Sequence, residues 1–389
     1  MIDNFRERAI EYHKGGKLAI IPKVPLESKE DLAIAYTPGV AEPCKVIAEN
    51  KDKVFDYTSK WNFVAIVSDG SAVLGLGNIG AYAAIPVMEG KALLFKKFAD
   101  IDAFPICLKT QDVDEIVKIV ENIEPVFGGI NLEDISAPRC FEIEQKLKER
   151  LDIPVFHDDQ HGTAIVVLGA LINALKLVGK GKDVKIVING AGAAGVAITK
   201  LLLKYSFKNI IVCDSKGIIS KEREDLNPAK KEIAKLTNKE NLQGSLKDAL
   251  KGADVFIGVS APNLLKAEDI SKMQDNAIVF ALANPIPEIM PEEARKGGAK
   301  IVGTGRSDFP NQINNALAFP GVFRGALDCR AREINDGMKI AAAEAIASYV
   351  KEDELKEEYI VPSVLDEGVH KAVAEAVKRK AIELNVARI

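Results

Sequence analysis

The chain has 389 residues, of which 47% are hydrophobic and 28% are charged, and its formal net charge at pH 7 is -4. Domains usually contain roughly 100 to 200 residues, so this length predicts two domains. Acidic and basic residues are interspersed, which excludes a strongly basic surface for nucleic acid, and no apolar stretch reaches the roughly 20 residues that span a bilayer. The start of the chain is charged, unlike a secretory signal. We therefore expect a cytoplasmic enzyme that binds neither nucleic acid nor membrane.

The first half of the chain predicts short buried strands that alternate with helices. A β-branched and aromatic run predicts a strand over 63–67. Apolar residues at helical spacing predict a helix over 112–120, and a buried strand follows over 125–131. A second helix from about 137 to 151 leads to a short strand over 153–156.

The second half has the regular alternation of a doubly wound α/β sheet. It starts with a long apolar helix over 162–179. Strand-like runs with helices between them follow at 185–189, 210–214, 254–260, 277–285 and 300–305. Such alternation predicts a parallel sheet of the Rossmann type, and we place the domain boundary near 157–165. The segment from Asn335 onward is mostly helical, and the sequence does not indicate which domain it packs against.

The pattern GxGxxG, a signature of dinucleotide-binding turns, occurs twice. GAGAAG at 190–195 follows a predicted strand and opens a helix, and Asp214 lies about 20 residues further on at the end of the next strand. With all three parts present, we predict that this turn binds a pyrophosphate and that Asp214 binds the ribose. The residues predicted to bind the dinucleotide in the turn are Gly190, Gly192, Ala193, Ala194 and Gly195.

The other match, GLGNIG at 75–80, lacks this context. Pro86 and Gly90 are predicted to interrupt the helix that follows, and no strand with a terminal acid comes at the required distance. We interpret this motif as a glycine turn needed for packing. The alternative is a loop that shapes a substrate cleft.

Pairs of acidic residues follow two predicted strands of the first domain. Glu133 and Asp134 come after one strand, and Asp158 and Asp159 come after the next. Ligands of open α/β sheets bind beyond the carboxyl ends of the strands, where neighbouring carboxylates repel unless a cation lies between them. Oxygen ligands without clustered cysteine or histidine favour Mg²⁺ or Mn²⁺ over zinc. For either pair alone, solvated loop acids or helix caps are an equally good interpretation.

Two histidines flank the second acidic pair in the segment HDDQHGT. The spacing of His157 and His161 suits a metal only on a helix, and this segment is expected to leave a strand. We interpret both as packing or hydrogen-bonding residues. Neighbours in an extended chain point to opposite sides, which predicts different roles for Asp158 and Asp159, one at the metal and the other orienting a base.

Two residues are candidates for proton transfer. Lys91 lies between apolar neighbours, where a lysine with a lowered pKa would act as a base. Tyr36 precedes an irregular TPG segment and is a candidate acid. Most lysines are solvated and most tyrosines pack, so each candidate depends on the wider pattern.

That pattern resembles the malic enzyme family, in its short NAD(P)-dependent form. The resemblance runs in order through nearly the whole chain. It consists of AYTPGVAEPC at 35–44, SDGSAVLGLGNIG at 68–80, PVMEGKA at 86–92, LEDI at 132–135, FHDDQHGTA at 156–164, GAGAAG at 190–195 and GRSDFPNQINNALAFPG at 305–321. It implies an N-terminal substrate and metal domain over 1–160 and an NAD(P)-binding Rossmann domain over 161–389.

The resemblance also implies roles for individual residues. The metal ligands would be Glu133, Asp134 and Asp159. The catalytic residues would be Lys91 as the base, Tyr36 as the acid and Asp158 as a carboxylate near the lysine. Substrate or nicotinamide would be held by Asn284 and by Asn314 or Asn315. Larger malic enzymes bind a malate carboxylate through an arginine at the position of Ala72, so here Ser71 and Arg306 are the candidates for that contact.

The implied reaction converts malate to pyruvate and carbon dioxide while NAD or NADP is reduced. Lys91 would remove the proton of the 2-hydroxyl as hydride leaves C2, a divalent cation would act as Lewis acid, and Tyr36 would protonate C3. Enzymes of this family are commonly homodimers or larger, and Tyr36 could serve its own site or that of a neighbour. Asp214 favours NAD, whereas Ser215 and Lys216 could accept a 2'-phosphate, so the choice of cofactor stays open.

Two other classes of protein remain alternatives. One is a metal-independent 2-hydroxy-acid or amino-acid dehydrogenase, which shares the two-domain plan but does not need the carboxylate pairs. The other is a noncatalytic NAD-binding sensor that has kept the fold. The presence of every expected catalytic position argues against the sensor.

Overall fold

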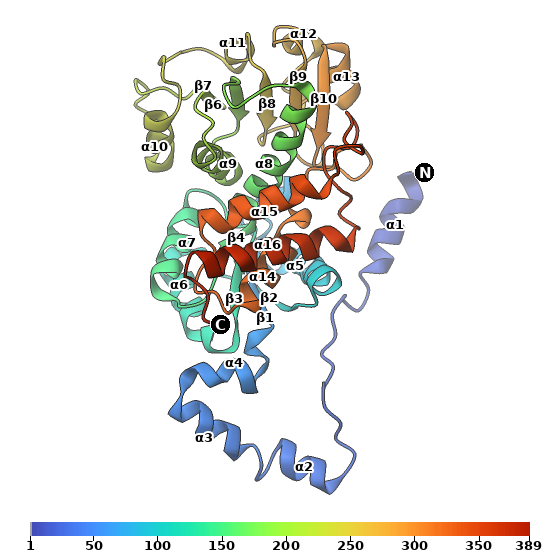
Figure 1. Ribbon diagram of the computed structural model, residues 1–389, viewed down its shortest axis with the longest axis vertical. Coiled ribbons are helices and arrows are strands. Elements are labelled where there is room, and N and C mark those ends of the chain that lie inside the picture. Colours follow the sequence, from blue (N-terminus) through green and yellow to red (C-terminus); the bar gives the residue numbers. More distant parts are fainter. Residues whose placement is uncertain (1) are drawn as a thin grey trace.

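The computed structural model describes residues 2–389. It consists of an N-terminal arm, a four-stranded sheet with its helices, and a six-stranded sheet with its helices (Figure 1). The arm carries α1 (Ile2–Tyr12), α2 (Lys29–Ala35) and α3 (Ala41–Glu49), and α4 (Val54–Tyr57) connects it to the first sheet. Lys17 and Lys23 of the arm bond to Pro86 of α5 and to Asp102 of β2. In Figure 1 the part of the arm that carries α2 and α3 extends away from both sheets before the chain returns at α4.

The first sheet is parallel and has the strand order β2-β1-β3-β4. Its strands are β1 (Phe63–Ser68), β2 (Asp102–Cys107), β3 (Gly129–Leu132) and β4 (Val155–His157). Three helices connect them, α5 (Gly80–Ala99), α6 (Val113–Ile123) and α7 (Arg139–Arg150). The predicted strands and helices of this half are confirmed, with ends shifted by a few residues. Strand β2 was not predicted. It contains Pro105 and lies at the sheet edge, where a missing N-H costs no hydrogen bond between strands.

Helix α5 runs without interruption for 20 residues, so the prediction that Pro86 and Gly90 break it is wrong. Pro86 removes one backbone hydrogen bond in the second turn. The helix nevertheless buries a face of Ala84, Met88, Lys91 and Phe95 against the core. This tertiary packing outweighs the local preference of the two residues.

Helix α8 (Asp158–Val178) connects the two sheets. It begins four residues earlier than predicted, so Asp158 and Asp159 lie in its first turn rather than in extended chain, and His157 is its N-cap residue. Among residues 2–389, this is the one helix long and apolar enough to cross a membrane, but 67% of its apolar window is buried inside the protein. Its apolar character is therefore that of a core helix.

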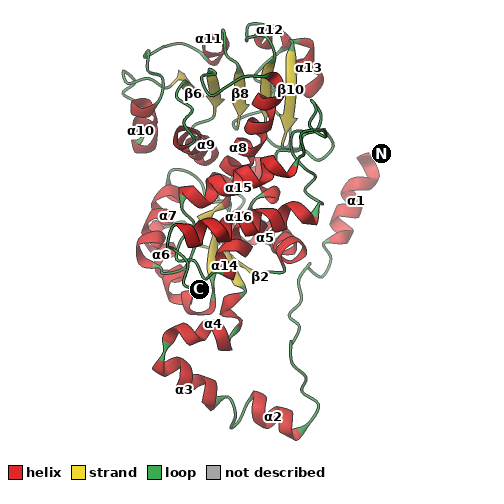
Figure 2. Ribbon diagram, viewed as in Figure 1, coloured by secondary structure: helices red, strands yellow, loops and turns green. Residues whose placement is uncertain are grey.

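The second sheet has the strand order β10-β9-β8-β5-β6-β7 and is parallel except for β7. Its strands are β5 (Ile186–Asn189), β6 (Ile210–Asp214), β7 (Gly217–Ile218), β8 (Val255–Gly258), β9 (Ala277–Ala281) and β10 (Ala299–Thr304). Its helices are α9 (Ala193–Lys204), α10 (Pro228–Leu236), α11 (Leu246–Leu250), α12 (Ala267–Ile270) and α13 (Pro291–Lys296). Figure 2 shows these helices in red around the yellow strands. The strand order reverses beside β5, as in the predicted Rossmann-type sheet, and the crevice at this switch point is where such sheets bind ligands.

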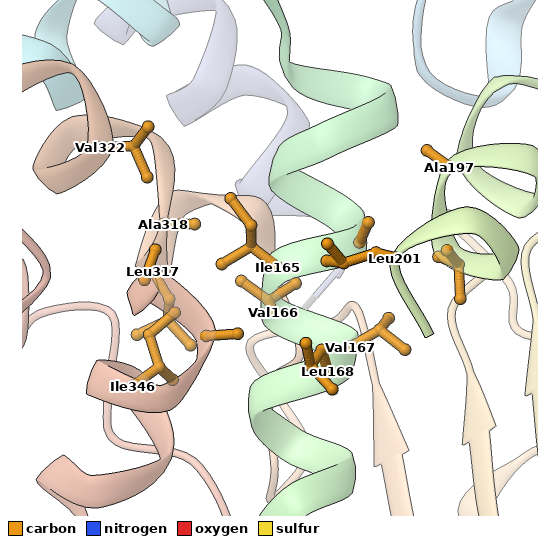
Figure 3. Close-up of a cluster of buried hydrophobic side chains, with 14 of the residues drawn as sticks. Ile165, Val166, Val167, Leu168, Ala197, Leu201, Leu317, Ala318, Val322 and Ile346 are labelled. Carbon is orange, nitrogen blue, oxygen red and sulfur yellow. The ribbon is translucent and has the colours of Figure 1, made fainter. Parts of the chain in front are cut away.

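The C-terminal helices return to the first sheet. They are α14 (Phe319–Asp328), α15 (Asp336–Tyr349) and α16 (Glu367–Glu383). A Cβ on Gly128 would lie 2.9 Å from Leu327 of α14, and one on Gly129, the first residue of β3, would lie 3.1 Å from Phe323 of the same helix. Figure 3 shows residues of α8, such as Ile165 and Leu168, between side chains of α9 and those of the C-terminal segment. One continuous core therefore joins α8, the first sheet and the C-terminal helices.

Candidate active site

Three carboxylates from two elements converge at the carboxyl end of the first sheet. Glu133 and Asp134 directly follow β3, and Asp159 lies in the first turn of α8. One oxygen of each lies within 4.8 Å of the others, and the backbone N-H of Asp134 donates to Asp159 Oδ2 at 2.8 Å. Glu133 and Asp134 are buried. The predicted convergence of these acids is thus present in the structure.

The electrostatics of this cluster suit a hard cation. Burial, followed by the charges of Asp159 and Glu133, raises the pKa of Asp134 to about 9. Burial also raises the pKa of Glu133, although Lys91 partly offsets this effect. Asp134 Oδ2 is buried and has no hydrogen-bond partner among the described residues. An all-oxygen donor set with an unpartnered buried oxygen is chemically suited to Mg²⁺ or Mn²⁺.

Lys91 reaches this cluster from the buried face of α5. Its Nζ donates to Glu133 Oε1 at 3.0 Å and to Asp158 Oδ2, and it lies 3.9 Å from the ring centre of Phe319. Burial lowers the pKa of Lys91, but the charges of Asp158 and Glu133 raise it by more, so the net shift is upward. The expectation of a lowered pKa is therefore wrong. The residues next to Lys91 in the sequence are apolar, but the groups that contact its amine in the structure are the carboxylates of Glu133 and Asp158.

Asp158 and Asp159 contact different partners, as predicted. They do so because both lie in the first turn of a helix, where neighbouring side chains point in different directions, and not because the chain is extended. Asp158 is fully buried and its Oδ2 accepts hydrogen bonds from Lys91 and from Asn315 Nδ2. Asn314 instead caps a short 3-10 turn, with its Oδ1 accepting from Ala316 N at 2.9 Å. Of the two asparagines, Asn315 is the one that reaches the lysine and carboxylate pair.

The two candidates for binding a malate carboxylate are both already engaged. The Ser71 hydroxyl donates to Asp69 Oδ1 at 2.5 Å and accepts from Ser136 N at 2.9 Å. Arg306 forms a two-point ion pair with Asp308, and its Nη1 donates to the Pro285 carbonyl at 3.0 Å. Ser71 borders the acidic cluster, whereas Arg306 lies at the carboxyl end of the second sheet. Neither position is free of intramolecular bonds.

The GLGNIG loop lies between the first sheet and the loop that follows β9. The N-H of Ala72, three residues before the loop, donates to the Asp134 carbonyl at 2.9 Å, which ties the segment leading into the loop to the acidic cluster. On its other side, a Cβ on Gly75 would lie 2.7 Å from the Asn284 carbonyl oxygen. Only glycine allows this approach, so the loop contacts exposed Asn284, which lies in the loop after β9 of the second sheet. Contacts with both halves of the molecule favour the alternative interpretation, a loop that shapes a substrate cleft.

The GAGAAG turn has the geometry that a dinucleotide site requires. Gly190 has a φ of 118° and packs against the Val259 carbonyl, and a Cβ on Gly195 would lie 1.7 Å from the Gly190 carbonyl oxygen. No atom lies within 4 Å of a Cβ built on Gly192, the N-cap of α9, so its backbone is open to a phosphate. Tight turn, open backbone and close helix packing are the three roles of glycine in the dinucleotide fingerprint.

Asp214 ends β6 as predicted, but its carboxylate is not free. Arg223 donates to both of its oxygens, at 2.8 and 3.1 Å, and Lys230 Nζ donates to Oδ2 at 2.6 Å. Burial raises the pKa of Asp214, yet these two cations hold it below its usual value. The expected ribose acid is thus part of a cationic cluster.

Tyr36 does not reach the site within its own chain. It is the C-cap residue of α2 in the arm, and 68% of its side chain is exposed. Figure 1 places α2 at the far end of the arm, away from both sheets.

Four residues that the sequence reading did not single out support the site. Asn131 Nδ2 donates to Glu133 Oε2 at 2.8 Å, and Phe319 lies under Lys91. Arg139 Nη1 donates to Asp69 Oδ2 at 2.7 Å. Buried Glu144 accepts from His161 Nε2 at 2.8 Å, which confirms the hydrogen-bonding interpretation of that histidine. A polar residue within a buried strand, such as Asn131, was a signal available in the sequence.

A sheet with the dinucleotide fingerprint, joined by one core to a second sheet whose carboxyl end carries a lysine and a group of carboxylates, defines a two-domain nucleotide-linked oxidoreductase. Residues 15–148 match the family model described as malic enzyme, N-terminal domain, and residues 160–382 match that described as malic enzyme, NAD binding domain. The chain belongs to the malic enzyme family.

Known proteins that cover nearly the whole chain agree with this assignment. The chain is 60% identical to the bifunctional malic/malolactic enzyme of Bacillus subtilis over 99% of this chain and 95% of that protein. It is also 60% identical to the NAD-dependent malic enzyme of Geobacillus stearothermophilus over 100% of this chain and 81% of that protein. The crystal structure of the malic enzyme from Pyrococcus horikoshii superposes with a TM-score of 0.95 at 54% identity, covering 100% of this chain and 92% of that one.

Proposed function

We propose that this chain oxidises and decarboxylates malate to pyruvate and carbon dioxide with reduction of NAD or NADP. The observation that carries the proposal is the convergence of Lys91, Asp158 and the three-carboxylate cluster at the carboxyl end of the first sheet, in a chain whose second sheet carries the GAGAAG turn. Membership of the malic enzyme family supports this reaction over a 2-hydroxy-acid or amino-acid dehydrogenase and over a noncatalytic sensor.

The residues of the chain divide the chemistry between them. Lys91, held by Asp158, takes the proton of the 2-hydroxyl as hydride leaves C2 for the nicotinamide. Asp158 compensates the charge that Lys91 gains and holds its amine in place, and Asn315 in turn holds Asp158. A lysine accepts a proton only in its neutral form, so Lys91 must release its own proton before it acts as the base.

Glu133, Asp134 and Asp159 would hold one Mg²⁺ or Mn²⁺ ion. The ion would supply a Lewis acid beside the 2-oxygen of the substrate, where negative charge develops as carbon dioxide leaves. The protein supplies the buried, mutually repelling carboxylates that need a cation.

A direct assay tests the reaction and its rivals together. Pyruvate and carbon dioxide are measured from malate with Mn²⁺ and each nicotinamide nucleotide, with and without a chelator. We expect equal yields of both products and loss of turnover with the chelator. Oxidation that ignores the chelator would favour a metal-independent dehydrogenase, and nucleotide binding without turnover would favour a sensor.

We propose that the active form is a homodimer or larger in which Tyr36 serves the site of a neighbouring subunit. Helices α2 and α3 bury none of their residues within the described chain. The adjoining arm exposes large apolar side chains, among them Ile20 at 87% and Ile21 at 77%. An exposed apolar surface of this kind is typical of an interface between proteins. A second copy of the chain that buries this surface would also accept Tyr36 into its own active site.

Mixing two inactive variants distinguishes this arrangement from a tyrosine that acts within its own chain. We expect Tyr36→Phe to lower kcat by about a hundredfold, the usual size of a general-acid contribution. If Tyr36 acts across the interface, a Tyr36→Phe subunit paired with a Lys91→Ala subunit has one complete site. Random mixing would then restore about a quarter of the wild-type activity. Mixtures that stay inactive although exchange of subunits is demonstrated would contradict the proposal.

We propose that the chain accepts both NAD and NADP. Relatives of this chain include malic enzymes named for each nucleotide. Arg223 and Lys230 neutralise Asp214, so its carboxylate repels a 2'-phosphate less than a free acid would, and both cations are placed to bind one.

Removing one of these cations should separate the two nucleotides. We expect Lys230→Ala to lower kcat/KM for NADP by about tenfold, which corresponds to about 1.4 kcal/mol, while kcat/KM for NAD changes little. Lys231→Ala, a change at an exposed neighbour on α10, is the matched control. An equal loss with both nucleotides would show that Lys230 has no role at the 2'-phosphate.

A further inference from the structure

A buried carboxylate outside the site described above ties together the loops at the edge of the nucleotide sheet. Glu288 lies between β9 and α13 and is 0% exposed. Its Oε1 accepts from Ser260 N at 2.8 Å, and its Oε2 accepts from Ala283 N at 3.1 Å. Ser260 belongs to the loop after β8 and Ala283 to the loop after β9, so each carboxylate oxygen holds one loop.

The surrounding chain is built around this carboxylate. A Cβ on Gly258, the last residue of β8, would lie 2.4 Å from the carboxylate carbon of Glu288. The φ of Gly258 is not positive, so its backbone conformation does not require glycine. Glycine is needed at this position because a side chain would occupy the space of the Glu288 carboxylate. The N-H of Leu265 also donates to the Glu288 carbonyl at 3.1 Å.

The same loops reach both ends of the proposed nucleotide site. Ser260 Oγ accepts from Asn189 Nδ2 at 2.7 Å, and Asn189 directly precedes the GAGAAG turn. On the other side, Ala283 directly precedes Asn284, whose carbonyl touches the GLGNIG loop. Hydrogen bonds thus run from Asn189 through Ser260 and Glu288 to the residue before Asn284.

We infer that Glu288 is a positioning residue, which sets the distance between the GAGAAG turn and Asn284 so that the nicotinamide end of the nucleotide meets malate. This inference rests on the proposed function. Glu288 is fully buried, so we assign it no direct contact with substrate or nucleotide. It acts through the backbone of two loops, each of which would shift if its carboxylate oxygen were lost.

Glu288→Gln tests the inference with little change in volume. A glutamine amide has one accepting oxygen and one donating nitrogen, so one of the two loops meets a donor instead of an acceptor. A displacement of about 1 Å at reacting groups can cost on the order of a hundredfold in rate, so we expect kcat for malate oxidation to fall by about 10- to 100-fold. The Kd of ADP-ribose, which lacks the nicotinamide, should change by less than about threefold.

Gly258→Ala is a second variant that disturbs the same contact from the other side. Its methyl group would collide with the Glu288 carboxylate, so we expect the same pattern of lost kcat and retained ADP-ribose binding. Glu292→Gln, at an exposed carboxylate four residues along the chain, is the matched control and should behave as wild type.

The outcomes separate this inference from the proposed function. If the wild-type enzyme does not oxidise malate, the proposed function fails. If the wild type is active and Glu288→Gln retains its kcat, the positioning role is refuted. It is also refuted if both variants lose ADP-ribose binding together with turnover, because Glu288 then only stabilises the fold.

Discussion

Lys91→Ala is expected to abolish malate oxidation and to leave nucleotide binding intact. Lys91 is the one base that contacts both Asp158 and Glu133 in the described structure. General acid and base groups contribute about 10² to 10⁴ in rate, and we expect a loss of about three orders of magnitude in kcat. The GAGAAG turn lies on a different sheet, so the Kd of NAD, measured by calorimetry, should not change.

Two further variants test whether the lost rate reflects a lost base. Lys91→Arg keeps the positive charge beside the acids but cannot accept a proton near neutral pH, so it should be as inactive as Lys91→Ala. Lys96→Ala removes an exposed lysine from the same helix and should retain full activity. Near-normal turnover by either variant of Lys91 would remove this lysine from the mechanism.

Asp159→Asn should weaken Mn²⁺ binding by about a hundredfold or more. Even residues that only support metal ligands commonly contribute 10- to 100-fold to affinity, and Asp159 would be a direct ligand. The asparagine keeps the size of the side chain and an oxygen that can accept from Asp134 N, so the loop should keep its shape. Mn²⁺ affinity is measured from the electron paramagnetic resonance signal of the free ion.

The activity of this variant should return at high Mn²⁺ concentration, because the lost interaction is binding of the ion rather than proton transfer. Asp114→Asn removes an exposed carboxylate from the same domain and should leave Mn²⁺ affinity unchanged. Unchanged affinity in Asp159→Asn would mean that the three acids do not form a metal site.

The sequence was sufficient for elements with strong periodic patterns and for motifs with a known physical role. Strands β5, β6 and β8 of the second sheet were predicted because alternating strands and helices leave regular apolar runs. The acids of the site were predicted because the carboxyl ends of parallel strands meet at one edge. Motif context distinguished the two glycine patterns, since GAGAAG lies between a strand and a helix of the second sheet. The preferred interpretation of GLGNIG, a turn needed only for packing, is not the one that its contact with Asn284 favours.

Tertiary contacts override local preference at the positions where the predictions are wrong. Pro86 lies within a continuous helix because the buried face of α5 stabilises it, and Pro105 lies in an edge strand that tolerates the missing N-H. The pKa of Lys91 is raised rather than lowered because Glu133 and Asp158 come from positions 42 and 67 residues away. The two hydrogen bonds that Glu288 accepts from Ser260 and Ala283 have no signature in the sequence, since an acid in the loop PIPEIM looks like any solvated loop residue.

The return of α14 and α16 to the first sheet means that the polypeptide passes between the two sheets twice, once through α8 and once after β10. Two chain connections permit the sheets to rotate about the line that joins the connections, but they resist twisting about the perpendicular axis. We therefore expect the two sheets to move relative to each other by a single bending motion. A truncated first half ending near residue 160 would also lack the helices that cover its own sheet, so it should not fold independently.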